Sequence, residues 1–453
     1  MSAAGYHTGR QLPLVGIETT NGEAAFADPA FSSNKAAPVH NWAPWIAGFS
    51  REFVAHAIAK YMQVPGTVLD PFAGVGNTLV EAVLHGHHAI GFEINPYAAL
   101  ASQLKANAHQ VDTSTLRKEI ARFRSFYQAA VSTGYTPHST YPKEFRTRSA
   151  FYSPDVLHKV LMVWDFIATT QESQIQDLFR LAFASTMVSY SNYSYEPSLG
   201  RRVTTGKGEI KDFPVGETVL SKLSKMVEDI TWFKSALPAG QMPTARVIQD
   251  SFFHYADHIT PQSIDLLITS PPYLNNYHYI RNTRPQLYWL GYARCPADLK
   301  HLEESNFGKY WQTVREGTPV HLDFSLPDTD IADRLDALRK ANPEKGIYGG
   351  AGWANHAASY FNDCYRFVLG IQYALRPGGT ALVVIGNSIL QGILMPTDQY
   401  LGKIAESVGL ELAGIEVPRM TRVGNSIIRS DVRVGKAKDH HSLYEAVVEI
   451  RKH

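Results

Sequence analysis

A short glycine-containing segment between an apolar stretch and a helical one constrains the fold of this chain more than any other feature. It runs Asp70-Pro71-Phe72-Ala73-Gly74-Val75-Gly76-Asn77-Thr78 and precedes the helical pattern NTLVEAVL. Glycines after a strand allow a tight turn and let a ligand approach the main chain. Glu93 lies seventeen residues beyond Gly76 at the end of the next strand-like stretch, where a carboxylate can accept hydrogen bonds from ribose hydroxyls. The spacing differs from the GxGxxG pattern of dinucleotide sites, so it argues against NAD.

The order of patterns around this segment predicts an α/β protein with a mostly parallel sheet. Helical patterns at 51–62, 77–86 and 96–107 alternate with strand-like stretches at 67–72 and 88–94, and such alternation is typical of parallel sheets. A second α/β stretch begins near Arg246. There we expect strands at 245–251, 264–270 and 380–388, helices at 360–375 and 397–410, a turn at 376–379, and a last strand at 443–452, antiparallel at the sheet edge.

Two stretches interrupt this alternation, at 111–244 and at 293–355. The first contains helical patterns at 155–170 and 177–190, and then a basic, glycine-containing loop at 198–213. The second is polar and irregular. The chain has no internal repeat and no low-complexity tract. One sheet with two elaborations therefore explains the pattern better than two independent domains.

The composition excludes several classes of protein. With 453 residues, 44% of them hydrophobic, the chain can bury a sizeable core, which rules out a disordered or fibrous protein. The 43 Lys and Arg residues balance 42 Asp and Glu residues, so the chain is not a global polycation, although one basic face could still bind nucleic acid. Its two cysteines, Cys295 and Cys364, argue against a disulfide scaffold or a cysteine-bound zinc. No apolar run could span a bilayer and no secretion signal is visible, so we expect a cytoplasmic protein without a membrane partner.

A second motif, Thr269-Ser270-Pro271-Pro272-Tyr273, follows the apolar stretch IDLLI. Two consecutive prolines make the backbone rigid and remove two amide donors, which leaves carbonyl acceptors. The turn can present the Ser270 hydroxyl, the Pro271 carbonyl and the Tyr273 ring to one planar ligand. This set suits a nucleobase with an exocyclic amine, because the oxygens can accept from its N–H groups and the ring can stack on it.

Together the two motifs resemble those of the S-adenosylmethionine-dependent DNA amino-methyltransferases, which methylate cytosine N4 or adenine N6. The resemblance covers about 39–107 and 246–453 and implies a Rossmann-like class I methyltransferase fold. The glycine motif precedes SPPY, as in the subclass that carries its target-recognition region between the two. The implied organisation is a cofactor-binding half at 1–110, a candidate target-recognition insertion at 111–245 and a catalytic half at 246–453, with the irregular insertion at about 293–355.

The resemblance also implies roles for individual residues. Glu93 matches the ribose-binding position, and Asp250, followed by Ser251, matches the segment that contacts the cofactor adenine. Residues 38–54 resemble the helix that flanks the methionine end of the cofactor. The implied cofactor-binding set is Asp70, Phe72, Gly74, Gly76, Asn77, Thr78, Glu93, Asp250 and Ser251, and the implied catalytic set is Ser270, Pro271, Pro272 and Tyr273. S-adenosylmethionine is the implied cofactor, and no metal ion is implied.

The implied chemistry is direct methyl transfer to the exocyclic amine of a flipped base. Hydrogen bonds to Ser270 and to the Pro271 carbonyl would localise the amine lone pair, and Tyr273 would hold the base by stacking. Neither cysteine lies in the Pro-Cys context of cytosine-C5 enzymes, so both are expected to be passive packing residues. Serine at the head of the motif resembles the cytosine-N4 branch more than the adenine-N6 branch. Methylation of adenine N6 or of an RNA base, and a nonenzymatic DNA-binding protein that uses the cofactor as an effector, are the alternatives.

Basic residues mark candidate contacts with double-stranded DNA, the expected partner. Four of them, Arg201, Arg202, Lys207 and Lys211, cluster in the glycine-bearing loop. Flexible cations suit phosphate contact and arginine can read guanine, although a solvated surface loop explains the cluster equally well. Residues that could line a flipped-base pocket, or pack in the core, are Tyr277, His278, Tyr279, Arg281 and Arg284, with Asn275 and Asn276 shaping the turn. The family resemblance also implies a restriction or defence context with companion proteins.

Two further polar groups lie outside these motifs. His85, His87 and His88 lack spaced acidic or cysteine partners, so we expect a surface turn rather than a metal site. The basic segment 419–426 is expected to be a loop, either beside the site or exposed to solvent.

Overall fold

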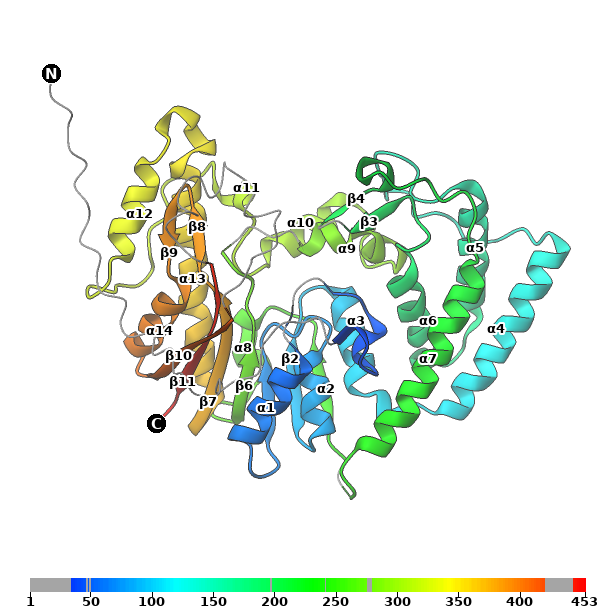
Figure 1. The fold of residues 1–453 in the computed structure, drawn as a ribbon, viewed down its shortest axis with the longest axis horizontal. Coiled ribbons are helices and arrows are strands. Elements are labelled where there is room, and N and C mark those ends of the chain that lie inside the picture. Colours follow the sequence, from blue (N-terminus) through cyan, green and yellow to red (C-terminus); the bar gives the residue numbers. More distant parts are fainter. Residues whose placement is uncertain are drawn as a thin grey trace.

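A seven-stranded sheet forms the centre of the protein (Figure 1). The structure is a computed structural model that describes residues 34–45, 48, 50–195, 198–240, 242–274, 279–419 and 443–453. The strand order is β10-β11-β7-β6-β1-β2-β5. The strands are β1 (Thr67–Asp70), β2 (His88–Phe92), β5 (Ala245–Ile248), β6 (Ile264–Thr269), β7 (Leu375–Gly386), β10 (Glu411–Arg419) and β11 (Glu445–Arg451).

The pairing of the strands shows how the two α/β stretches of the sequence meet. β1 pairs in parallel with β2 on one side and with β6 on the other. β5 continues the parallel sheet beyond β2, and β7 continues it beyond β6. β11 is antiparallel to both of its neighbours, β7 and β10. The predicted α/β fold with a mostly parallel, Rossmann-like sheet is confirmed.

Two details of the sheet differ from the prediction. The last strand was expected at the sheet edge, but β11 lies inside the sheet because β10, which the sequence patterns did not indicate, pairs with its other side. The turn expected at 376–379 lies within the bounds of β7. The register with β6 shifts there, between the pairs Ile264–Leu375 and Leu266–Thr380. The Pro-Gly-Gly sequence is thus accommodated as an irregularity in the strand, with Gly378 at a φ of 80°.

Helices cover both faces of the sheet. Val68 of β1 belongs to one hydrophobic core and its neighbour Leu69 to another, because successive strand residues point to opposite faces. The first core packs against α1 (Arg51–Tyr61), α2 (Asn77–Leu84) and α3 (Pro96–Ala106), and the second against α13 (Gly350–Ala374) and α14 (Thr397–Ser407). These helices were all predicted. α13 starts ten residues before the predicted helix, so the end of the stretch taken as irregular, up to residue 355, is helical.

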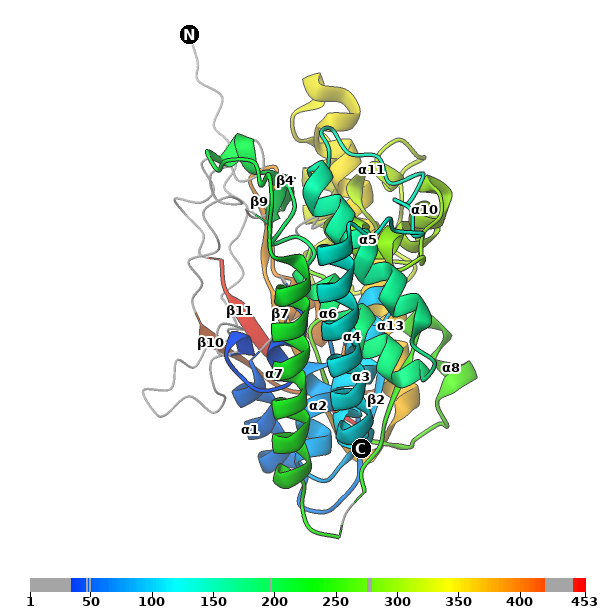
Figure 2. The ribbon, with the colours of Figure 1, turned by 90° about the vertical axis from the view of Figure 1, so that its right-hand side faces the viewer.

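Helices also fill the first interruption of the α/β alternation. They are α4 (Thr113–Thr133), α5 (Pro154–Thr169), α6 (Ser173–Thr186) and α7 (Val215–Ala236). α4 and α7 lie side by side (Figure 2). The rings of Phe123 from α4, Phe166 from α5 and Phe179 from α6 pack against one another. They belong to the same hydrophobic core as the buried residues of α1, α2 and α3. A short hairpin, β3 (Tyr193–Tyr195) with β4 (Leu199–Arg201), lies between α6 and α7 in the chain.

The second interruption contains short helices between β6 and β7. Within it lie α10 (Pro296–Glu304), α11 (Trp311–Val314) and α12 (Ile331–Lys340), whereas α9 (Tyr279–Trp289) lies between β6 and this interruption. The remaining elements are α8 (Tyr255–His258), the hairpin of β8 (Ser388–Leu390) and β9 (Ile393–Met395), and the 3-10 helices η2 (His40–Trp42), η3 (Ala108–Gln110), η4 (Arg202–Thr205), η5 (Phe252–His254) and η6 (Pro343–Tyr348). Figure 1 shows α12, β8 and β9 at the end of the molecule opposite α4 and α7. In the part of the chain that the structure describes, no helix is both long and apolar enough to cross a membrane.

Candidate active site

The predicted motifs meet at the carboxyl ends of three adjacent strands. β1 ends at Asp70, β2 ends immediately before Glu93, and β6 ends immediately before Ser270. Because β1 lies between β2 and β6, the glycine segment is flanked by Glu93 on one side and by SPPY on the other. The carboxyl ends of parallel strands are where α/β sheets bind ligands.

The glycine segment turns through two residues with left-handed backbone conformation. Gly74 has a φ of 51° and Gly76 a φ of 82°, a region that L side chains rarely adopt. A Cβ on Gly74 would lie 3.0 Å from Nε1 of Trp45, and a Cβ on Gly76 would lie 2.5 Å from Oγ of Ser102 in α3. Gly76 therefore allows close packing of α3, rather than only the ligand approach for which the sequence suggested it.

Asp70 connects the turn to both neighbouring elements. Its Oδ1 accepts hydrogen bonds from Thr269 Oγ1 at 2.6 Å and from the Phe72 N–H at 3.0 Å, and its Oδ2 accepts one from Thr78 Oγ1 at 2.6 Å. Burial raises the pKa of Asp70 to about 6, against the lowering effect of these bonds. Asp70 and Thr78, both predicted to bind the cofactor, thus use their side chains to join β1, β6 and α2.

Glu93 is anchored by backbone donors from both sides. Its Oε2 accepts a hydrogen bond from the Gly74 N–H at 2.9 Å, and its Oε1 accepts one from the Asn95 N–H at 2.7 Å. Burial raises the pKa of Glu93 to about 8. A carboxylate has about four lone-pair positions, so each oxygen retains capacity to accept a further hydrogen bond. The group fits a ligand that offers two adjacent hydroxyls.

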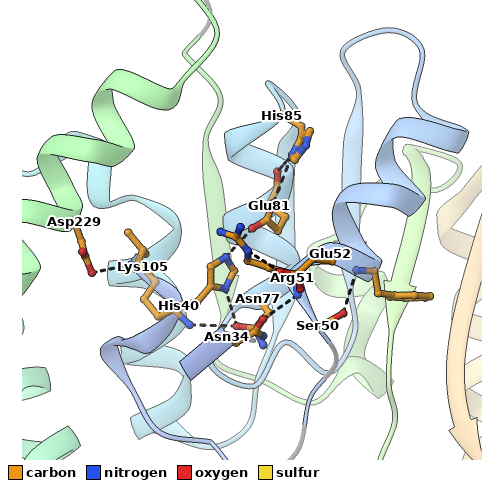
Figure 3. A network of polar contacts seen from close by, with 12 residues as sticks. Asn34, His40, Ser50, Arg51, Glu52, Asn77, Glu81, His85, Lys105 and Asp229 are labelled. Carbon is orange, nitrogen blue, oxygen red and sulfur yellow. Dashed lines mark hydrogen bonds and ion pairs between the residues drawn. The ribbon is translucent and has the colours of Figure 1, made fainter. Parts of the chain in front are cut away.

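A buried polar network lies beneath the glycine segment (Figure 3). Asn77, the first residue of α2, contacts His40 Nδ1 at 3.1 Å through Oδ1, and Lys105 Nζ donates to the same oxygen at 3.4 Å. Lys105 also donates to the Val75 carbonyl at 2.6 Å, and Glu81 contacts His40 Nε2 at 2.7 Å. The Asn77 side chain, predicted to bind the cofactor, therefore faces this network.

Asp250 and Ser251 follow β5, next to β2. The Glu93 N–H donates to the Ile248 carbonyl at 3.0 Å, which brings this segment beside Glu93. The Asp250 carboxylate accepts hydrogen bonds from the Ser251 N–H, His254 Nδ1 and His258 Nε2. Partial burial would raise its pKa, but these bonds, with that of His258 foremost, lower it overall. The contact of Asp250 and Ser251 with the cofactor stays a prediction.

Two aromatic side chains lie at the glycine segment: Phe72 belongs to it, and Trp45 contacts it at Gly74. The Phe72 ring packs against Phe307 and Phe367, with centroids 5.1 and 5.4 Å away. Trp45 lies over Gly74 and stacks on Tyr279 at 6.5 Å between centroids. Trp45 belongs to the segment that resembles the family's methionine-flanking helix, although here 40–42 form a 3-10 turn and α1 starts only at Arg51.

In the SPPY turn the tyrosine is linked to a residue that the sequence did not indicate. Ser270 Oγ donates to the Tyr273 hydroxyl at 3.4 Å, and that hydroxyl donates to Glu445 Oε1 at 3.1 Å. A Cβ on Gly386 would lie 3.2 Å from the Tyr273 ring, so the ring rests on the backbone of β7. Burial raises the pKa of Tyr273 well above its usual range, and the charge of Glu445 adds to this. Pro271 is buried, whereas Ser270 and Pro272 are half-buried.

The predicted DNA-contacting residues lie in β4, in η4, in the loop after η4 and in α9. Arg201 lies in β4 and Arg202 begins η4, whereas Lys207 and Lys211 are exposed in the following loop. The stretch is thus partly structured rather than a simple flexible loop. Arg281 is exposed on α9. Arg284, also on α9, donates to the Arg146 carbonyl at 2.8 Å and stands over the rings of Phe145 and Tyr288.

Some predicted residues lie elsewhere or outside the described part of the chain. Asn275, Asn276, Tyr277 and His278 lie outside it, as do residues 420–426 of the basic segment. The histidine turn is only partly at the surface, because His87 is buried and accepts from the Gly66 N–H at Nδ1. Cys364 is buried in α13, whereas Cys295 is half-buried at the start of α10. Among the described residues, no group of three or more His, Cys, Asp or Glu could hold a metal ion.

Comparison with known proteins relates the chain to DNA-modifying enzymes. Residues 23–103 match the family described as DNA methylase. Type II methyltransferase M.BsoBI of Geobacillus stearothermophilus is 24% identical over 435 residues, which span 88% of this chain and 83% of that protein. Type II methyltransferase M.AvaI of Nostoc sp. is 21% identical over 416 residues, 88% and 84% of the two chains. Type II methyltransferase M.MvaI of Kocuria varians is 24% identical over 344 residues, 74% and 73% of the two chains.

Proposed function

The chain belongs to the S-adenosylmethionine-dependent DNA amino-methyltransferases, and from this premise we propose that it methylates N4 of a flipped cytosine in double-stranded DNA. The observation that supports the proposal best is the meeting of Glu93, the glycine segment and SPPY at the ends of β2, β1 and β6. A ribose-bearing cofactor and a planar amine could therefore bind next to each other. The Type II relatives support a restriction-modification context, in which a companion endonuclease would be the further partner.

The residues around the glycine segment fit the cofactor. Glu93 keeps acceptor capacity on both carboxylate oxygens for the ribose hydroxyls, and Asp250 with Ser251 follows the adjacent strand, where the adenine would lie. Gly74 and Gly76 turn the chain through positive φ at this point. When bound, S-adenosylmethionine supplies a methyl group made electrophilic by the sulfonium. The protein's task is then to hold a poor nucleophile, the exocyclic amine, in the right place and hydrogen-bonded state.

The SPPY turn prepares Ser270 as an acceptor for that amine. Since the Ser270 hydroxyl donates its proton toward Tyr273, and Tyr273 donates toward Glu445, the lone pairs of Ser270 Oγ remain to accept an N–H from the base. The Pro271 carbonyl supplies the second acceptor. Together they would localise the lone pair on the amine nitrogen. Tyr273 would stack on the flipped base with a ring that Gly386 and Glu445 hold in place.

No covalent enzyme intermediate is required in this scheme. Cys364 is buried in α13 and Cys295 immediately precedes α10, so neither belongs to the SPPY turn. Burial raises the pKa of the Cys364 thiol well above its usual range, which makes it a poor nucleophile. This distinguishes the site from chemistry at cytosine C5.

A product analysis tests the proposal. The protein is incubated with S-adenosylmethionine and, in parallel, with duplex DNA, RNA or no substrate, and the nucleic acid is digested to nucleosides that are identified by mass. We expect N4-methylcytosine from DNA alone. N6-methyladenine as the sole product would overturn the cytosine assignment, methylated RNA alone would replace DNA by RNA, and the absence of any methylated nucleoside would refute a nucleic-acid methyltransferase. The Ser270→Ala, Tyr273→Ala variant serves as the inactive control.

A further inference from the structure

Helix α9 (Tyr279–Trp289) connects two parts of the protein that the sequence places far apart. It begins six residues after Tyr273 of the SPPY turn. Three of its polar side chains are almost fully buried, those of Asn282, Thr283 and Gln286. Asn282 and Gln286 hold the β3–β4 hairpin, whereas Thr283 contacts the loop that carries Glu93.

On the hairpin side, the contacts involve both strands. Asn282 Oδ1 accepts from the Leu199 N–H of β4 at 2.9 Å, and the Asn282 carbonyl accepts from the Tyr195 hydroxyl of β3 at 3.0 Å. Gln286 Nε2 donates to the same hydroxyl at 3.2 Å. With three residues per strand, this hairpin is too short to be stable by itself. It is therefore held by its neighbours: by α9 through these contacts, and by Phe151, on which the Tyr193 ring of β3 stacks. The contacts with α9 help to place Arg201 at the end of β4 and Arg202 directly after it.

On the cofactor side, a single buried hydrogen bond makes the connection. Thr283 Oγ1 accepts from Asn95 Nδ2 at 2.7 Å, and its own proton goes to the Tyr279 carbonyl within the helix. Asn95 caps α3 with its Oδ1 and donates its backbone N–H to Glu93 Oε1 at 2.7 Å. Any displacement of Thr283 therefore acts on Asn95, whose backbone N–H holds Oε1 of Glu93.

The helix also contains a point of reduced rigidity between its turns. Pro285 supplies no N–H, so the Arg281 carbonyl lacks the usual partner four residues on. Residues 279–284, which carry Asn282 and Thr283, are thus joined less firmly to the remainder of α9. The hairpin is attached on both sides of this point, because Asn282 precedes Pro285 and Gln286 follows it.

We propose that α9 couples the binding of duplex DNA at the β3–β4 hairpin to the binding of the cofactor at Glu93. The inference rests on the proposed function, since it takes duplex phosphates as the ligand of Arg201, Arg202, Lys207 and Lys211. Asn282 is a positioning residue for the basic hairpin, and Thr283 is a positioning residue that transmits the position of the helix to Asn95. The coupling is reciprocal, because each ligand changes the affinity for the other by the same factor.

The cofactor half of the link is tested with two Thr283 variants of the full-length protein. Affinity for a short fluorescein-labelled duplex of mixed sequence is measured with and without S-adenosylhomocysteine, and the affinity for S-adenosylhomocysteine is measured without DNA. In the parent we expect S-adenosylhomocysteine to tighten duplex binding about fivefold or more. Thr283→Val removes the hydroxyl at nearly constant shape and should abolish the tightening while each separate affinity stays within about twofold. Thr283→Ser keeps the hydroxyl and should restore the tightening.

The hairpin half is tested with Asn282→Ala and Tyr195→Phe. Each should weaken duplex binding about five- to tenfold, and neither should change the affinity for S-adenosylhomocysteine in the absence of DNA. The two substitutions break different hydrogen bonds of this attachment, so the double variant should lose more affinity for the duplex than either single one. A variant that merely unfolded α9 would lose affinity for both ligands, so the separate cofactor measurement distinguishes the two effects.

The outcomes separate this inference from the proposed function. Full tightening in Thr283→Val, no tightening in the parent, or unchanged duplex affinity in Asn282→Ala and Tyr195→Phe would each overturn the coupling through α9. Unchanged duplex affinity after neutralising Arg201, Arg202, Lys207 and Lys211 together would instead remove the hairpin as the DNA surface. Failure of the parent to bind S-adenosylhomocysteine would contradict the methyltransferase itself.

Discussion

Thr269 Oγ1 donates a hydrogen bond of 2.6 Å to Asp70 Oδ1. Thr269 is the last residue of β6, immediately before Ser270, and Asp70 is the last residue of β1, immediately before the glycine segment. Both side chains are buried. A single bond between neighbouring strand ends thus sets the position of the proposed base-binding turn relative to the proposed cofactor turn.

Thr269→Val should lower the free energy of unfolding by about 1–2 kcal/mol and slow methyl transfer. Valine keeps the shape but leaves Asp70 without one of its buried donors. Unfolding by urea and single-turnover methylation measure the two effects. Thr170→Val is the matched control, because Thr170 is buried and its hydroxyl has no hydrogen-bond partner among the described residues. Equal stability of the Thr269 variant and the parent would contradict the role of this bond.

Tyr273→Phe should reduce the rate of methyl transfer about three- to tenfold without affecting cofactor affinity. The substitution keeps the ring but removes the acceptor toward which Ser270 donates its proton. Tyr273→Ala should cost more, because base stacking contributes about 1–3 kcal/mol. Tyr444→Phe is the control. Tyr444 directly precedes Glu445, and the substitution removes a hydroxyl that donates to Asp398. Parental rates for Tyr273→Phe would show that the Ser270–Tyr273–Glu445 chain is not used.

The affinity for S-adenosylhomocysteine should rise between pH 6 and pH 9 because Glu93 ionises in this range. Burial raises the pKa of Glu93 to about 8, so the carboxyl is largely protonated at pH 6 and ionised at pH 9. Ribose hydroxyls donate hydrogen bonds, and the ionised form accepts them best, so binding improves as the pH passes through about 8. Calorimetric titrations across this range should show a rise that Glu93→Gln lacks. The same rise in Glu93→Gln would assign it to another group.

Lys105→Met should remove a gain in stability that the parent shows as the pH increases above 7. Burial lowers the pKa of Lys105 to about 7 from its ordinary 10.5. Between these values the unfolded chain binds more protons than the folded one, so this group makes the folded state more stable as the pH rises and less stable as it falls toward 7. Urea unfolding of the parent and the variant between pH 7 and pH 10 measures the difference. The control is Lys118→Met, on the exposed face of α4. Its free energy of unfolding should change with pH in the same way as that of the parent. A constant difference between the Lys105 variant and the parent would refute the prediction.

Replacing Arg201, Arg202, Lys207 and Lys211 by alanine should weaken duplex binding and flatten its dependence on salt. Each lost phosphate contact reduces the slope of log affinity against log salt by about 0.9. Fluorescence anisotropy at several salt concentrations measures the slope. The control replaces four exposed lysines on other helices, Lys60, Lys118, Lys225 and Lys403. If both sets change the slope equally, the hairpin has no special part in binding DNA.

The strands and helices that build the sheet could be predicted because their signals are local. Residues 67–72 and 88–94 contain apolar runs of strand length, and Gly74 and Gly76 occur where the chain must turn through positive φ. The position of β11 could not be predicted. Whether an antiparallel strand ends at an edge or is inserted between two others depends on β10, whose sequence has no clear alternation.

The same distinction applies to the site. Asp70, Glu93 and SPPY were found from their motifs, and their roles toward the cofactor and the base stay predictions. The partners that hold them were not found from motifs. Glu445 is 172 residues from Tyr273, and Asn95 is 188 residues from Thr283. Nothing in the local pattern around Glu445 or Thr283 distinguishes them from other polar residues.

The amino-acid sequence by itself determined the turn-forming glycines, the rigid SPPY corner and the acidic residue after β2, because backbone conformation and side-chain chemistry are properties of short segments. Only the tertiary structure decided which groups meet: Thr269 with Asp70, Tyr273 with Glu445, and α9 with both the basic hairpin and the Glu93 loop. Hydrogen bonds between distant segments depend on strand order and register, and these are selected by the packing of the whole sheet against its helices.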